Sequence, residues 1–280
     1  MPRANPVACV SLPGGASHVA TIAGAASALD ETIDVPGWSG ASAGGLVAIA
    51  KAFAVPDRRI HDLLRVILRD NRMLDVAPFE LGDMGICSWQ VIPDAIDELL
   101  GKGAMMGDAL TALVVVASDL GERRPQYFSR KHTPRVLVRE VARATSAFPL
   151  VAPQVKVPSF TDDGRLFTDG GVTDNTTDAV WDGWSVPRVA VRLTGSDARH
   201  DVHYGDPLAQ SFALVGALQF SAGTMKSTRQ DGLVVDVPKR GDGMDFSLSI
   251  AQIDERWNTG RSAVLAHASA LKALRSASNG

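Results

Sequence analysis

Cysteine is scarce in this sequence, which contains only Cys9 and Cys87 among its 280 residues. Two cysteines are too few for a disulfide framework, and by themselves they do not make a zinc site. Cys9 lies in an apolar run over residues 7–10, so we expect a small buried thiol there. No two histidines have the His-x-x-x-His spacing of a zinc site on a helix. The sequence therefore suggests neither a metal ion nor an organic cofactor.

Long apolar runs are also missing. The best candidate, over residues 212–223, is shorter than the roughly 18 apolar residues of a membrane span, and it contains Gln219. The N-terminal residues lack the long hydrophobic stretch of a secretory signal. We therefore expect a cytoplasmic protein without a transmembrane segment.

Neither sign of charge is in excess. The 28 Lys and Arg residues against 31 Asp and Glu residues leave a formal net charge of −3. A protein that neutralises nucleic-acid phosphates usually carries a basic stripe, whereas the basic residues here are scattered in short groups such as Arg58-Arg59. The charge distribution argues against a nucleic-acid partner.

Strand and helix patterns alternate along the chain, with an ordinary content of 45% hydrophobic residues for a globular core. We predict strands at 7–12, 33–38, 110–117, 164–169, 187–193 and 233–237, and helices at 18–29, 46–54, 58–69, 91–100, 135–145, 208–220 and 257–274. This alternation predicts an α/β fold, with three α/β/α layers around a mainly parallel sheet. Because no repeat or linker interrupts it, residues 1–280 are predicted to form a single domain.

The segment from Gly40 to Gly44 matches the G-x-S-x-G pattern of a nucleophile elbow, with Ser42 at its centre. A serine that projects from a sharp strand-to-helix turn needs small neighbours, because the backbone doubles back beside them. The helix that follows directs its N-terminal amides toward the reacting carbonyl. Small-residue turns also produce this pattern by chance, so the pentapeptide alone does not identify an enzyme.

Two further turns carry groups that suit catalysis. Gly14, Gly15 and Ala16 follow the first predicted strand, and their backbone amides are suited to an oxyanion hole or an ordinary strand-to-helix turn. Asp169 ends another predicted strand, where side chains point toward the crevice in which α/β proteins bind ligands. An Asp-Gly-Gly sequence is equally compatible with a structural turn.

Five segments together resemble the patatin-like phospholipase family, and they occur in that family's order. They resemble its glycine-rich oxyanion segment with the first helix (10–29), its nucleophile elbow (40–45), a recurring strand pair (116–129), the helix before the base (139–149) and the segment of the catalytic aspartate (166–175). The motif-bearing part covers about residues 7–195. The resemblance implies the patatin-like form of the α/β fold.

The resemblance also implies a serine carboxylic-ester hydrolase of the phospholipase or lipase type, working through a Ser-Asp dyad. Ser42 would attack the ester carbonyl, and Asp169 would take up its proton without an intervening histidine. Backbone amides of Gly14, Gly15 and Ala16 would hold the oxyanion of the reaction. An acyl-enzyme would form, and water would release the fatty acid.

The implied partner is a lipid or phospholipid substrate presented at a membrane surface, which makes a peripheral membrane location part of the expectation. An apolar rim around the serine is expected for such substrates. Candidates for this rim are residues 70–90, predicted to be a loop or flap, and residues 208–225, although core packing explains most of these positions equally well.

The glycine-rich segment departs from the family pattern. Ala16 occupies the place of its third glycine, His18 that of a basic residue and Val19 that of a last glycine. An alanine keeps its N–H but does not easily adopt a positive φ, and a histidine is mostly neutral near pH 7. A catalytically impaired binding or structural protein with the same fold therefore stays open as an alternative.

A Ser-Asp-His triad of the α/β-hydrolase kind is a second alternative. Ser42, Asp169 and then His200 or His203 would follow that chain order. However, only about two predicted strands precede Ser42, whereas the α/β-hydrolase elbow follows several, and both histidines lie in a polar segment typical of a solvated loop.

Overall fold

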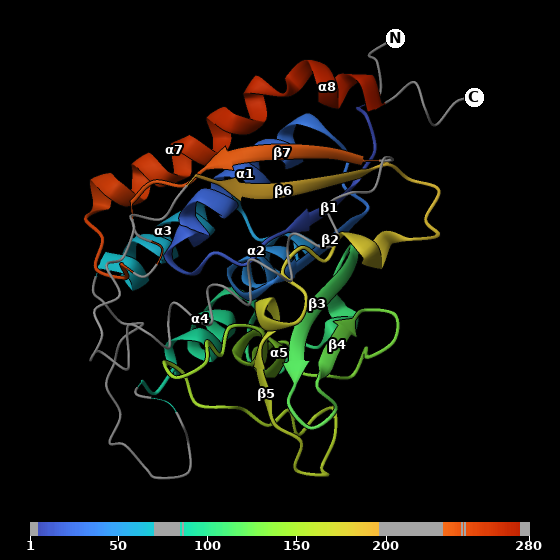
Figure 1. The fold of residues 1–280 in the computed structure, drawn as a ribbon, viewed down its shortest axis with the longest axis vertical. Helices are drawn as coiled ribbons and strands as arrows, with labels where there is room; N and C mark the ends of the chain where they lie inside the picture. The colour runs from blue at the N-terminus through green and yellow to red at the C-terminus, as the bar shows by residue number, and fades with distance from the viewer. Residues whose placement is uncertain are drawn as a thin grey trace.

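A seven-stranded sheet forms the centre of the computed structural model, which describes residues 5–69, 85, 87–195, 232–241, 243 and 245–274 (Figure 1). Its strands are β1 (Cys9–Leu12), β2 (Gly37–Ala41), β3 (Ala112–Asp119), β4 (Arg124–Ser129), β5 (Phe167–Asp169), β6 (Arg188–Thr194) and β7 (Gly232–Pro238). They are ordered β4-β3-β2-β1-β6-β7, and β5 pairs with β3 off this path. Only β4 and β5 run antiparallel to their neighbour, so the predicted mainly parallel sheet is confirmed.

Helices flank this sheet, as an α/β fold requires (Figure 1). They are α1 (Val19–Thr32), α2 (Ser42–Ala52), α3 (Asp57–Arg69), α4 (Val91–Leu100), α5 (Val138–Thr145), α7 (Ile250–Ala266) and α8 (Ala268–Ala273). The short 3-10 helices are η1 (Ala16–His18), η3 (Met106–Asp108), η4 (Gly170–Val172) and η5 (Asp178–Trp181). On β1 and β2, the hydroxyls of Ser11 and Ser39 contact Thr177 and Trp181, so the segment around η5 covers that side of the strands.

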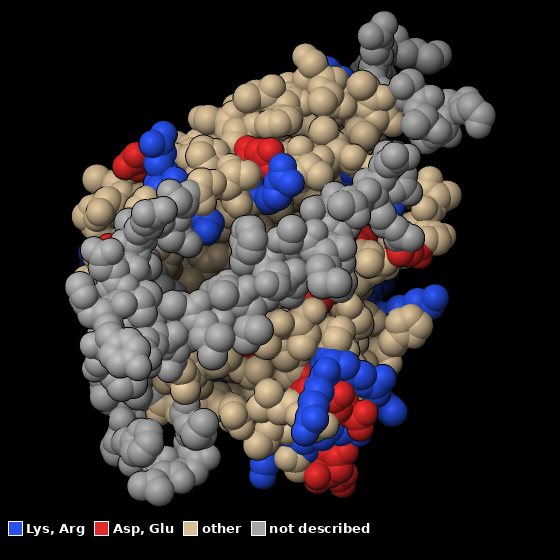
Figure 2. Space-filling model, viewed as in Figure 1, with Lys and Arg blue, Asp and Glu red and all other residues tan. Residues whose placement is uncertain are grey.

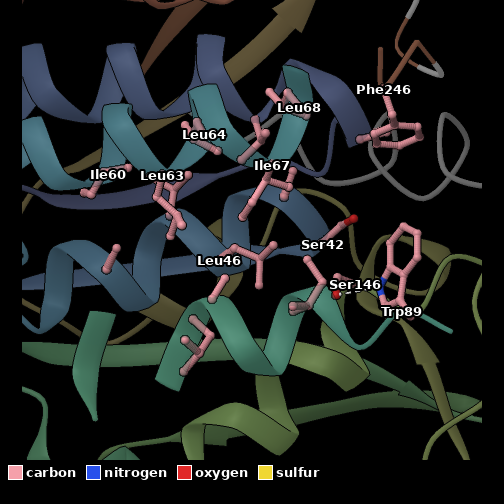
Figure 3. Close-up of a pocket in the computed structure, with 18 of the residues that line it drawn as sticks. Ser42, Leu46, Ile60, Leu63, Leu64, Ile67, Leu68, Trp89, Ser146 and Phe246 are labelled. Atoms are coloured by element: carbon pink, nitrogen blue, oxygen red, sulfur yellow. Dashed lines mark hydrogen bonds between the residues drawn. The ribbon is translucent and has the colours of Figure 1, made fainter. Parts of the chain in front are cut away.

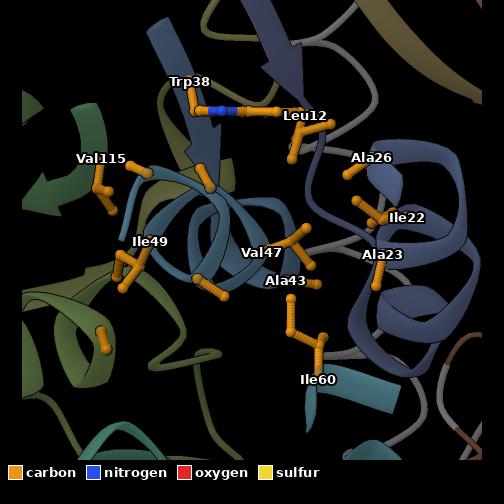
Figure 4. Packing of buried hydrophobic residues seen from close by; sticks show 14 of the residues in the cluster. Leu12, Ile22, Ala23, Ala26, Trp38, Ala43, Val47, Ile49, Ile60 and Val115 are labelled. Atoms are coloured by element: carbon orange, nitrogen blue, oxygen red, sulfur yellow. The ribbon is translucent and has the colours of Figure 1, made fainter. Parts of the chain in front are cut away.

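Helix α2 lies in the middle of the apolar core (Figure 4). Its side chains at Ala43 and Val47 point toward α1 and toward Ile60 of α3, while Trp38 and Val115 approach it from the sheet. All five side chains are buried. The helix that follows Ser42 is therefore held on several sides, which fixes its first turn in space.

Helices α1 and α7 pack at backbone distance because each supplies a glycine to the contact. A Cβ on Gly24 would lie 2.0 Å from the Trp257 carbonyl oxygen, and a Cβ on Gly260 would lie 2.0 Å from the Thr21 carbonyl oxygen. Any side chain at these two positions would push the helices apart. Helix α7, near the C-terminus, therefore packs closely on the first α-helix, α1 (Figure 1).

Most predicted helices are observed, with shifted ends. The predicted helices at 58–69 and 91–100 correspond to α3 and α4 almost residue for residue. The helix predicted from residue 257 begins at Ile250, because Ser249 caps it and exchanges hydrogen bonds with Gln252. Cys9 is buried as expected. The predicted helix at 208–220, the 208–225 rim and most of the 70–90 flap lie outside the described residues.

Basic and acidic side chains lie close together on the face shown in Figure 2. Among the described residues, the exposed guanidinium of Arg192 donates two hydrogen bonds to the carboxylate of Asp236, at 2.6 and 2.9 Å. The described residues on this face therefore form no broad area of one charge. Within the described ranges, no helix combines the length and the apolar character needed to cross a bilayer.

Candidate active site

Two strands meet end to end along one edge of β3, and their meeting point carries the candidate dyad. Parallel β2 pairs with β3 up to Ala41, which lies opposite Val116. Antiparallel β5 pairs with the next residues along the same edge of β3, and its last residue, Asp169, lies opposite Ala117. Ser42 directly follows Ala41, so the sheet brings Ser42 and Asp169 into contact although they are 127 positions apart in sequence.

The Asp169 carboxylate is fully buried and accepts a hydrogen bond at each oxygen. Ser42 Oγ donates to Oδ2 at 2.6 Å, and the Gly171 amide donates to Oδ1 at 2.7 Å. Burial raises the pKa of Asp169 from 3.8 to about 7, and the bonds from Ser42 and Gly171 offset only part of this rise. A carboxylate with a pKa near neutrality is a much stronger base than a hydrated aspartate, and it already contacts the hydroxyl proton.

Ser42 occupies a strained turn between β2 and α2. Its φ of 51° is in the left-handed region, which non-glycine residues rarely adopt. Its backbone amide donates to Thr145 Oγ1 at 2.9 Å, and Thr145 in turn donates to the Val116 carbonyl of β3 at 2.6 Å. The buried hydroxyl of Thr145 thus ties the strained residue to the strand that positions Asp169.

The glycines of the elbow are required by close backbone contacts. A Cβ on Gly40 would lie 2.4 Å from the Gly44 carbonyl oxygen, and a Cβ on Gly44 would lie 2.4 Å from the Pro13 carbonyl oxygen. Gly40 and Gly44 therefore pack on each other across the turn, and Gly44 brings α2 against the loop after β1. The G-x-S-x-G spacing has a steric cause in this chain.

The glycine-rich turn lies directly beside Ser42. A Cβ on Gly14 would lie 3.2 Å from Ser42 Cβ, and the Gly14 amide donates to Asn175 Oδ1 at 3.0 Å. Among the described residues, the amides of Gly15 and Ala16 have no such acceptor. Of the three expected oxyanion donors, the Gly14 amide is thus already occupied, whereas the amides of Gly15 and Ala16 are not bonded to another described residue.

Ala16 corrects the expectation that alanine would avoid a positive φ at this position. Its φ is 46°, so the turn keeps the left-handed conformation without the third glycine. The neighbouring His18 is buried and ends η1, and Val19 begins α1 and lines a pocket. The turn therefore keeps its shape despite the altered residues, with Ala16 in a strained conformation.

An apolar pocket opens at Ser42 and extends between α2, α3 and α4 (Figure 3). Among the described residues that line it, only Ser42 and Ser146 are polar. Ser146 Oγ is occupied, since it accepts from Trp89 Nε1 at 3.1 Å and donates to the Ala142 carbonyl at 2.8 Å. Trp89 also meets Phe246 edge to face at the end of the pocket where Ser42 lies. Within the described lining, the pocket therefore presents the Ser42 hydroxyl, itself bonded to Asp169, on an otherwise apolar wall.

A family model for patatin-like phospholipases matches residues 10–180, a span that contains the glycine-rich turn, Ser42 and Asp169. The chain belongs to the patatin-like phospholipase family. This membership assigns it to the lipid hydrolases at the level of the family and confirms the resemblance that its motifs indicated.

The patatin-like fold extends over nearly the whole chain. VipD from Legionella pneumophila superposes with a TM-score of 0.55 at 14% identity, covering 96% of this chain and 67% of VipD. The type III effector protein ExoU gives a TM-score of 0.45 at 14% identity, covering 96% of this chain and 54% of ExoU. No curated protein matches the sequence. At such low identity, the likeness to VipD concerns the fold alone.

The histidines of the rival triad, His200 and His203, lie outside the described residues. Within the described part of this patatin-like chain, the Ser42 hydroxyl donates to a carboxylate, and the other carboxylate oxygen is occupied by Gly171. The described ranges contain no group of three or more His, Cys, Asp or Glu side chains placed to bind a metal ion.

Sequence reasoning gave no role to Thr145, Asn175 or Phe246, whereas Trp89 belongs to the 70–90 segment that was a candidate for the apolar rim and does line the pocket. Thr145 and Asn175 stand within segments that resemble the family, but their contacts with Ser42 and Gly14 depend on the tertiary fold. Trp89 and Phe246 come from distant parts of the chain and meet only at the pocket. No local pattern marks Thr145, Asn175 or Phe246.

Proposed function

We propose that this patatin-like protein hydrolyses fatty-acyl esters of lipids, with Ser42 as nucleophile and Asp169 as its base. The observation that carries the proposal is the 2.6 Å hydrogen bond from Ser42 Oγ to the buried Asp169 carboxylate, at the mouth of an apolar pocket. Hydroxyl, base and apolar surface are the three components that cleavage of an acyl ester needs.

The reaction begins when Ser42 Oγ attacks the ester carbonyl carbon while its proton moves to Asp169 Oδ2. The amides of Gly15 and Ala16 stabilise the oxyanion that develops on the carbonyl oxygen. As the ester C–O bond breaks, the leaving alcohol takes the proton from Asp169, and the acyl group stays on Ser42. Water then attacks this acyl-enzyme with Asp169 again accepting a proton, which frees the fatty acid and restores the Ser42 hydroxyl.

The substrate's acyl chain enters the apolar pocket, and its polar part remains outside, next to Ser42. Burial of each CH₂ group contributes about 0.8 kcal/mol to binding of the chain. A lipid or phospholipid at a membrane surface supplies such a chain, so we propose a cytoplasmic enzyme that works peripherally on membranes without a cofactor or metal.

Hydrolysis of a nitrophenyl butyrate ester by the purified chain tests this proposal. We expect Ser42→Ala and Asp169→Asn each to lower kcat/KM by a factor on the order of 10³ or more. Ser146→Ala is the matched control, because it removes the other hydroxyl of the pocket, and we expect it to stay within about tenfold of wild type.

The two rival functions give different results in the same assay. A wild-type chain that hydrolyses no ester but binds fatty acids would favour a binding protein with an inactive site. Activity that survives in Asp169→Asn and disappears in His203→Ala would replace the dyad with a Ser-Asp-His triad.

A further inference from the structure

The apolar pocket is lined by one stripe of side chains from each of three helices. On α3 the stripe is Ile60, Leu63, Leu64, Ile67 and Leu68, with the i, i+3, i+4, i+7 spacing of a single helical face. Helix α2 contributes Ser42, Ala43, Leu46, Val47 and Ala50, and α4 contributes Ile92, Ala95, Ile96 and Leu99. The pocket is thus a channel parallel to the axes of these helices.

All three stripes extend from the Ser42 end of the channel to the same far end. In Figure 3, Ser42 and Trp89 lie at one end with Leu68 on their side, and Ile60 lies at the other end. Helix α3 therefore runs opposite to α2, so the far end of the channel is formed by the last residue of the α2 stripe, Ala50, and the first of the α3 stripe, Ile60.

The length of the channel follows from helix geometry. Eight residues separate Ser42 from Ala50 and also Ile60 from Leu68, and at 1.5 Å per residue both stripes are about 12 Å long. An extended polypeptide advances at most about 3.6 Å per residue over three backbone bonds, or about 1.2 Å per bond. An extended alkyl chain advances by a similar distance per carbon–carbon bond. The channel accordingly accommodates an alkyl chain of about ten carbons.

Polar contacts join the helices where the channel ends. Lys51, which follows Ala50, forms an ion pair at 2.9 Å with Asp57 at the start of α3, and a second one at 2.6 Å with Asp30. Arg59 of α3 donates to the Glu98 carbonyl of α4 at 3.0 Å. The Lys51–Asp57 ion pair thus joins α2 to α3, and the Arg59–Glu98 hydrogen bond joins α3 to α4. An alkyl chain longer than the channel would have to separate paired polar groups, which is unfavourable.

From this geometry we infer that the channel measures acyl chains and selects those of about eight to twelve carbons, with Ala50 and Ile60 as the residues that set the limit. The inference rests on the proposed function of Ser42, because it places the ester carbonyl at the Ser42 end. Ala95 lies partway along α4, so a larger side chain there blocks the channel closer to Ser42 than one at position 50.

A series of nitrophenyl esters from butyrate to stearate, in one detergent, tests the limit. For the wild type we expect kcat/KM to be highest between about eight and twelve carbons and to fall at least about tenfold at sixteen. Ala50→Leu should move this optimum down by about two to four carbons, Ala95→Leu should move it further, and Ile60→Ala should move it up. Urea denaturation of the three variants checks that the fold is intact.

Calorimetric binding of free fatty acids of six to eighteen carbons to Ser42→Ala provides the second measurement, because it reads the channel without catalysis. Affinity that rises with each added carbon up to about ten and then falls for longer fatty acids supports the inference. Equal rates and affinities from ten to eighteen carbons would overturn it, as would an Ala50→Leu variant that slows every ester by the same factor. A wild-type protein that binds fatty acids with this length limit but hydrolyses no ester would instead contradict the proposed function alone.

Discussion

At the scale of one residue, the proposed role of Asp169 as base links activity to pH. Its pKa is raised to about 7 by burial, and only the ionised form accepts the Ser42 proton. We expect kcat/KM for a short ester to fall about tenfold for each pH unit below 7 and to reach a plateau above it. A pH–rate profile between pH 5 and 9 checks this. A profile that is flat over that range would contradict a base with this pKa.

The same burial makes the dyad a cost to stability. The folded-state pKa lies above the unfolded value of 3.8, so the folded protein holds the proton more tightly, and stability falls as the pH rises through 3.8 toward 7. The neutral side chain of Asp169→Asn escapes this loss. The free energy of unfolding of the inactive Asp169→Asn should therefore exceed that of wild type by up to about 4 kcal/mol at pH 8, and by much less at pH 4.

The turn between β1 and α1 contains a strain that a single substitution can remove. Ala16 has a φ of 46°, and the left-handed region costs an L-residue roughly 1–2 kcal/mol. Ala16→Gly should raise the free energy of unfolding by about 0.5–1 kcal/mol, because the greater freedom of glycine in the unfolded chain offsets part of the gain.

Ala20→Gly is the matched control for this turn, since Ala20 lies inside α1. The same exchange in a regular helix should lower the free energy of unfolding by about 1 kcal/mol. Urea denaturation of both variants distinguishes local strain from a general effect of glycine. Equal destabilisation by the two substitutions would show that the turn stores no strain.

Among the elements, those with strong local patterns were predictable from the sequence. The amphipathic helices α3 and α4 and the β-rich run of β3 were located within a few residues of their observed ends. The start of α2 was not located correctly, because Ser42 belongs to a strained turn. Gly40 and Gly44 permit this turn by letting backbone segments approach closely. Periodicity carries no information about such contacts.

The candidate site was predictable only as far as its residues lie in local motifs. Ser42 and Asp169 were identified by their turns, but their meeting depends on the pairing of β2 and β5 with one edge of β3. The Gly14 amide donates its hydrogen bond to Asn175 Oδ1, 161 positions away. The apolar pocket is formed by three helices in contact, so no single segment could reveal it.

At the scale of the whole molecule, we propose that residues 1–280 form one domain. The strand β7 and the helix α7 follow the motif-bearing part, yet β7 joins the central sheet beside β6 and α7 packs on α1. Separation of the C-terminal third would therefore expose the edge of β6 and one face of α1, both of which are buried in the chain described here.

The contact between α1 and α7 allows the single-domain proposal to be tested. A Cβ on Gly260 would lie 2.0 Å from a backbone oxygen of α1, so Gly260→Ala should lower the free energy of unfolding by about 2–4 kcal/mol. The midpoint of a single urea transition should fall, without a second transition appearing. Gly121→Ala is the control, because a Cβ there approaches only the Asp119 carboxylate, at 3.4 Å. Two separate transitions in Gly260→Ala would indicate two domains.

The end-to-end meeting of β2 and β5 has a consequence for how this fold tolerates change. Ala41, which precedes Ser42, pairs with Val116, and Asp169 pairs with the adjacent Ala117, so the spacing of Ser42 and Asp169 is independent of the length of chain that connects them. Insertions in the surface connections between α2 and β3 or between α5 and β5 leave this spacing untouched. Substrate range can therefore diverge through those connections while the chemistry at the junction is inherited unchanged.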